Sequence, residues 1–111
     1  MERHTDNELF EMANLSKSKT GLNCIVWVQT NMPDSIDKHN APRIKFSDND
    51  TLIPVSISVQ PMLLGGVKLQ DLHISSEGLQ SIFDWIRRNY KALMELWNGY
   101  ITTDEFIEKM K

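Results

Sequence analysis

His39 is the first residue in this chain whose type suggests chemistry, because an imidazole can transfer a proton or hold an anion near neutral pH. It lies in a polar stretch, residues 30–42, just before a basic segment. No serine, cysteine or carboxylate is placed by local spacing to complete a catalytic set with it. We therefore expect a solvated loop histidine. An enzyme centred on His39, with Asp48 or Asp50 as its carboxylate, is the least favoured function.

Two carboxylates and one thiol offer other chemistry, and their surroundings argue against it. Asp48 and Asp50 resemble the start of a calcium loop, but such a loop needs glycine at its sixth position and glutamate at its twelfth. Ile53 and Val59 occupy those positions. Cys24 lies in an apolar run, which is typical of a small core residue and not of a reactive thiol. We expect no catalytic residue, no metal and no cofactor.

Basic residues suggest nucleic-acid binding as the alternative function. Four of them, expected near one face or edge of a sheet, could contact a single strand: Lys17, Lys19, Arg43 and Lys45. Such binding normally adds aromatic side chains on which bases stack, and the expected outward positions hold only serine, lysine and arginine. The net charge of −3 also argues against broad capture of nucleic acid or of acidic membranes.

The elements that position these residues are clearest in the C-terminal third. One long helix is predicted by apolar residues at a 3.6-residue period: Leu79, Ile82, Phe83, Ile86, Tyr90, Leu93 and Trp97. Ser75 or Ser76 can cap its start, and Asn98-Gly99 ends it. Thr102 to Glu105 fits a capping box, which predicts a short final helix with Phe106 on its buried side.

The long helix also carries charged and apolar residues outside its main apolar face. Asp84 precedes Arg88 by four residues, and Lys91 precedes Glu95 by four, so we expect both pairs to interact along the helix. A second apolar stripe contains Trp85, Ala92 and Leu96, with Asn89 among them. Either the final helix folds back to cover Trp85, or the stripe is exposed and binds a partner. In the second case the anchors would be Trp85, Leu96 and Trp97, joined by Tyr100.

Upstream residues predict a sheet for this helix to pack on. Residues 24–28 are continuously apolar and suit a central, buried strand, whereas residues 43–47 and 53–59 alternate between apolar and polar. Pro54 indicates an edge strand or a bulge. After a turn at Gly65-Gly66, residues 67–72 form a weaker last strand. Short turns without a crossover helix favour an antiparallel arrangement.

The expected architecture is therefore a two-layer α+β domain. A three- to four-stranded antiparallel meander packs against one long C-terminal helix and a short terminal helix. Residues 1–18 form an N-terminal arm, either a short helix or disordered, and residues 19–111 form the single domain. One cysteine excludes an internal disulfide, and neither a signal peptide nor a membrane-spanning apolar run is evident. We expect a cytoplasmic protein.

Residues 38–98 resemble small bacterial and phage-borne domains of unknown function, of the kind found in toxin–antitoxin-type or mobile-element gene clusters. Those domains typically show a His-Xaa-Pro-Pro-His start to a strand and a terminal helix closing in Ala-Trp. This chain has His39, Pro42 and Trp97 in matching positions, with Ala41 in place of a proline and Arg43 in place of the second histidine. The resemblance implies a small prokaryotic accessory protein and no particular chemistry.

The leading functional hypothesis is a non-enzymatic interaction or regulatory module of prokaryotic or phage origin. It would bind a protein partner, or a second copy of itself, through the apolar helix surface. The absence of any catalytic signature and the second apolar stripe motivate this hypothesis.

Overall fold

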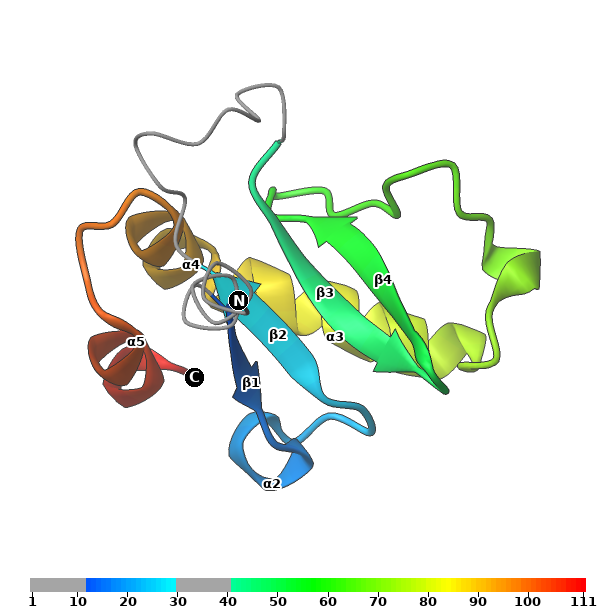
Figure 1. Cartoon of the computed structure of the whole chain (residues 1–111), viewed down its shortest axis with the longest axis horizontal. Helices are drawn as coiled ribbons and strands as arrows, with labels where there is room; N and C mark the ends of the chain where they lie inside the picture. Colours follow the sequence, from blue (N-terminus) through cyan, green and yellow to red (C-terminus); the bar gives the residue numbers. More distant parts are fainter. Residues whose placement is uncertain (1–11, 30–40) are drawn as a thin grey trace, which may run out of the picture.

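The computed structural model describes residues 12–29 and 41–111 of the chain (Figure 1). His39, with the other residues of 30–40, and most of the expected N-terminal arm lie outside these ranges. The described elements, in chain order, are β1 (Met12–Leu15), α2 (Lys17–Thr20), β2 (Val26–Gln29), β3 (Arg43–Asp48), β4 (Thr51–Ser56), the 3-10 helix η1 (Leu69–Asp71), α3 (Ser76–Arg88), α4 (Tyr90–Trp97) and α5 (Thr103–Lys109).

Four strands form one antiparallel sheet in the order β1-β2-β3-β4, so each strand pairs with its neighbour in sequence. This confirms the expected α+β class and the antiparallel meander. β1 was not predicted, because residues 12–15 were assigned to the N-terminal arm, which was expected to be either a short helix or disordered. The sequence Met-Ala-Asn-Leu has only weak strand propensity, and pairing with β2 along its whole length overrides that local preference.

The predicted last strand at residues 67–72 is wrong, because that segment contains η1 instead. The residues that extend the sheet beyond β4 come earlier in the chain. Ser56 N–H donates to the Met62 carbonyl, Leu64 N–H donates to the Pro54 carbonyl, and Val55 forms an isolated bridge with Leu63. Pro54 thus lies on the outermost full strand, as its missing N–H predicts.

The predicted long helix is two helices with a break at Asn89. The Asn89 side-chain amide donates to the Trp85 carbonyl at 2.9 Å, so a side chain competes for a main-chain acceptor at the junction. The expected caps are confirmed. Ser75 Oγ accepts from Gly78 N–H, and Thr102 and Glu105 form a reciprocal capping box at the start of α5. Gly99 adopts a left-handed φ of 78° and ends the helical stretch.

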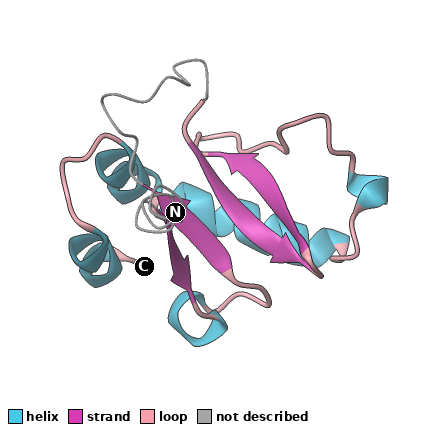
Figure 2. Ribbon diagram, viewed as in Figure 1, coloured by secondary structure: helices cyan, strands magenta, loops and turns pink. Residues whose placement is uncertain are grey.

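The helix α3 forms a layer behind the sheet, whereas α2 and η1 lie outside that layer (Figure 1 and Figure 2). Figure 1 shows α3 crossing behind the sheet, with α4 and α5 on the side of the sheet where β1 lies. Side chains from both layers make a single core, whose fully buried members include Leu15, Val26, Val28, Ile44, Phe46, Val55, Ile82, Trp85, Ile86, Leu93, Leu96 and Phe106. Along β3, Ile44 and Phe46 point into this core while Arg43 and Lys45 point away, as the alternation predicts.

Candidate partner-binding surface

The second apolar stripe of the helices belongs to the core and does not form an exposed surface. Trp85 is 0% exposed, Leu96 1% and Trp97 5%, so the prediction that these three side chains anchor a partner is corrected. Tyr100 differs from them, because it is 77% exposed in the turn between α4 and α5.

α5 is the reason for this burial. Its capping box starts a helix that packs against α4 and turns Phe106 inward. The Phe106 ring meets the Trp85 indole edge to face, with ring centroids 6.2 Å apart. Trp85 Nε1 is buried and finds no hydrogen-bond partner in the described part of the chain. The indole is therefore held by packing, which is the role of a core residue.

The opposite face of the sheet presents a more unusual surface. Among the described elements, no helix covers the sheet face that is turned toward the reader in Figure 1. Strand register places one row of side chains across all four strands on this face: Asn14, Trp27, Lys45 and Pro54. The neighbouring row contains Ile25, Ser47 and Leu52, because Ser47 N–H donates to the Ile25 carbonyl and Ser47 pairs with Leu52. We call these seven residues, together with Arg43, the outer sheet face.

The outer sheet face combines apolar side chains with two cations. Trp27 and Ile25 are half-buried, and Leu52 is 41% exposed, although the uncovered face of an antiparallel sheet is usually polar. Lys45 lies directly opposite Trp27 on the adjacent strand, within reach of its ring. A rigid aromatic beside cations and aliphatic side chains has the composition of a protein-binding surface.

Sequence reasoning did not identify Trp27 as part of a site. The run at 24–28 is continuously apolar, and this favours burial on both faces of a central strand. In the structure only Cys24, Val26 and Val28 face the core, and Trp27 alternates with them onto the other side. Gln29, two residues after Trp27, was the signal that this face is not enclosed.

The four basic residues considered for nucleic-acid binding do not form one cluster. Arg43 and Lys45 share the outer sheet face. Lys17 and Lys19 lie on α2, at the end of the sheet where β3 finishes, whereas Arg43 begins β3 at the other end (Figure 1). Only two of these four basic residues, Arg43 and Lys45, therefore lie on the same surface.

A small polar hollow of about 170 Å³ lies beside that same end of the sheet, and its lining includes Cys24, Asp48 and His73. Asp48 Oδ2 accepts from the His73 N–H at 2.9 Å and lies 3.3 Å from His73 Nδ1, and Asp48 Oδ1 accepts from the Ile74 N–H at 3.0 Å. Burial opposes the charge of Asp48, but these bonds outweigh it and hold the pKa of the carboxyl below its ordinary value.

These residues do not make a catalytic set. No hydrogen bond within the described ranges joins Cys24 to His73, and burial raises the pKa of the Cys24 thiol, which keeps it protonated. Asp50 is exposed and does not join Asp48. Across residues 12–29 and 41–111, no group of three potential metal ligands occurs. Asp48 therefore has a structural role, fixing the segment before α3 to the end of β3.

Comparison with known proteins adds no family or neighbour to this description. No family model, curated protein or solved structure matches the chain. Within the described ranges, no helix combines the length and the apolar character that crossing a bilayer requires.

Proposed function

We propose that this chain is a non-enzymatic protein-interaction module that binds its partner through the outer sheet face. The observation that carries the proposal is the exposed Leu52 beside half-buried Ile25 and Trp27, on a sheet face without a helical cover among the described elements. The helix surface first expected to serve this role is occupied by the chain's own α5.

The charges on the outer sheet face indicate what kind of partner suits it. Lys45 on β3 lies opposite Trp27 on β2, and Arg43 lies two residues before Lys45 on the same face of β3. A partner with an apolar centre and an acidic rim would complement this arrangement. A protein surface of that kind gains from burying Trp27 and Leu52, while opposite charges at the rim accelerate association.

A photo-crosslinking experiment in cells of the source organism tests the proposal. A benzophenone amino acid at Leu52 should capture a specific protein, because position 52 projects from the outer sheet face. The matched control places the same group at Leu69, which is comparably exposed at 48% but lies on η1. A crosslinked protein at position 52 that is absent at position 69, and that disappears with Lys45→Glu, supports the proposal. Identical patterns at both positions contradict it.

Single-strand nucleic-acid binding remains the second candidate, and the pairing of Trp27 with Lys45 favours it. This candidate predicts that a labelled oligonucleotide binds at low salt, and that affinity falls steeply with added salt because phosphate contacts release counterions. Fluorescence anisotropy with wild type and Lys45→Glu measures both effects. No binding to single-stranded DNA or RNA at low salt would remove this candidate.

A prokaryotic or phage-borne accessory role in the cytoplasm is part of the same proposal. It is supported by the residues that carry the resemblance, His39, Pro42 and Trp97. Tyr100 stays in the proposal as a secondary contact, since its side chain is largely exposed.

A further inference from the structure

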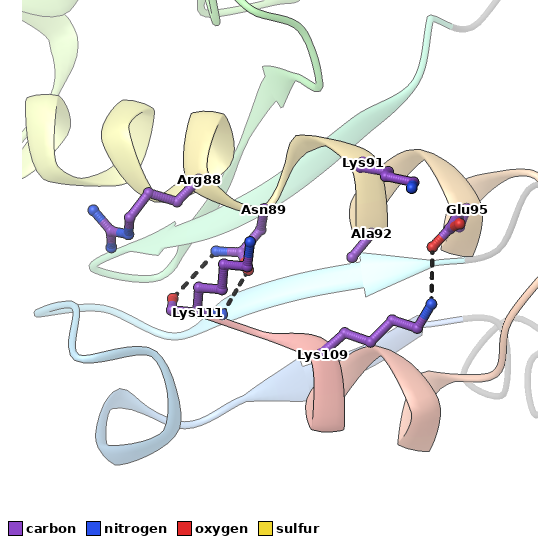
Figure 3. A pocket seen from close by; sticks show the side chains of 7 residues that line it. All are labelled: Arg88, Asn89, Lys91, Ala92, Glu95, Lys109 and Lys111. Atoms are coloured by element: carbon purple, nitrogen blue, oxygen red, sulfur yellow. Dashed lines mark hydrogen bonds and ion pairs between the residues drawn. The ribbon is translucent and has the colours of Figure 1, made fainter.

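We infer that a hollow between α4 and the C-terminal end of α5 binds a small phosphate-bearing anion. The hollow measures about 310 Å³ and is distinct from the outer sheet face, because it belongs to the helical layer. Its lining contains four cations, Arg88, Lys91, Lys109 and Lys111, and a single carboxylate, Glu95. Figure 3 shows Lys109 reaching toward Glu95 across the space between the two helices and Lys111 lying against Asn89, while Arg88 extends from the end of α3.

The break at Asn89 brings the cations together from distant parts of the sequence. Asn89 is 2% exposed, and its Oδ1 accepts from the Lys111 N–H at 2.8 Å while its Nδ2 lies 3.4 Å from the Lys111 main-chain oxygen. These contacts fix the segment after α5 against the junction of α3 and α4 (Figure 3). Lys109 and Lys111 are thereby placed across the hollow from Arg88 and Lys91.

The two ion pairs expected along the helix do not form, and Glu95 instead pairs with Lys109 inside the hollow. Asp84 pairs with Arg87 at 2.7 Å instead of Arg88, and Glu95 pairs with Lys109 at 3.3 Å instead of Lys91. Arg88 and Lys91 therefore have no ion-pair partner in the described part of the chain. Arg88 ends α3 and Lys91 lies in the first turn of α4, so the two cations reach the hollow from either side of the break at Asn89.

The residue types and the size of the hollow point to phosphate. A guanidinium offers paired donors that match phosphate oxygens, and lysine ammonium groups add point charges around them. The volume lies at the lower end of the range for small-molecule pockets, about 300–1,000 Å³, which suits a phosphate ester or a short polyphosphate.

Titration of the ¹⁵N-labelled protein with inorganic pyrophosphate tests this inference by NMR. We expect saturable shifts of the amides of Asn89, Lys91 and Ala92 and of Lys109 and Lys111. The double variant Arg88→Gln/Lys91→Gln should bind about tenfold more weakly or worse, because two charge-assisted contacts are lost.

The matched control is Arg87→Gln, which removes a neighbouring charge on α3 that does not line the hollow. It should bind pyrophosphate as wild type does. Both substitutions lie at exposed positions, and an unchanged amide spectrum outside the site will show that the variants fold. Shifts that do not saturate, or equal affinities for wild type and the double variant, would overturn the inference.

Discussion

Trp85 and Trp27 lie on two apolar surfaces of the same small domain, and the two surfaces differ in how far they are buried. The helix stripe around Trp85 lies outside the main apolar face of the helix, yet Trp85 and Leu96 are fully buried, with Phe106 of α5 packed against Trp85. The strand around Trp27 is apolar throughout, yet its outward side chains stay partly accessible. The two surfaces differ because α5 packs over Trp85, whereas no described helix packs over the outer sheet face. Periodicity locates an apolar face, whereas a distant segment decides whether it is covered.

The largest expected effect comes from removing the covered tryptophan. Trp85→Ala leaves a cavity under α5, and we expect a loss of about 3–5 kcal/mol in the free energy of unfolding. Urea denaturation followed by circular dichroism measures it. Trp85→Phe is the matched control. It keeps an aromatic ring at this position, although a smaller one, and removes an indole N–H that has no described partner. Its cost should be much smaller.

This result separates the two surfaces directly. Suppose instead that Trp85→Ala stays folded with near wild-type stability and loses self-association or partner binding. Trp85 would then belong to an interface, and the helix stripe would not be part of the core.

Substitution of Asp48 should give the next largest loss in the free energy of unfolding, and this loss should depend on pH. Its folded pKa is lowered, so its stabilising contribution is present above the ordinary pKa of aspartate and is lost as the pH falls through the folded value. Asp48→Asn should cost about 1–3 kcal/mol near neutral pH, because charge-assisted bonds to His73 and Ile74 are weakened.

The measurement is a series of urea midpoints from neutral to acidic pH. Wild type should lose stability on acidification more steeply than Asp48→Asn. Parallel curves for the two proteins would show that Asp48 is not the group responsible.

A smaller effect is expected where α5 begins. Thr102→Ala removes the cap that accepts from Glu105 N–H, and should cost about 1 kcal/mol. Because α5 covers Trp85, the tryptophan emission should also shift to the red before the main unfolding transition. Thr103→Ala, one residue further along and outside the cap, is the control. Equal behaviour of the two variants would argue that the capping box does not hold α5 in place.

The smallest effect on stability belongs to the outer sheet face. Leu52→Ser replaces an exposed apolar side chain and should change the free energy of unfolding by about 0.5 kcal/mol or less. Crosslinking and binding through this face should nevertheless be lost. A large loss of stability would mean that Leu52 is already packed within the molecule, and the outer sheet face would then resemble the helix stripe.

Local signals predicted the elements that depend on local physics. The 3.6-residue period around Leu79 and Ile82, the serine and threonine caps, Gly99 and the alternation of β3 all have causes within a few residues of sequence. These features are confirmed, together with the antiparallel meander.

The predictions that failed depended on contacts distant in sequence. β1 forms because β2 is available to pair with Met12–Leu15. For Trp85 the sequence left two alternatives open, and the structure bears out the one in which the final helix folds back to cover it, so the expected exposed anchor is the part that failed. The candidate surface was missed for the same reason, since an apolar strand does not itself reveal which of its faces the described helices will cover. The break at Asn89 was also missed. There the side-chain amide of Asn89 donates to the Trp85 carbonyl, and the spacing of apolar residues carries no information about such a bond.

The strap formed by Met62–Leu64 has a consequence for how copies of this chain can join. By occupying the main-chain groups of Pro54 and Ser56, it leaves β4 without the continuous row of free donors and acceptors that templates another strand. The strap therefore protects the β4 edge against pairing with a strand of another molecule, and β1 is the outermost strand on the opposite side of the described sheet.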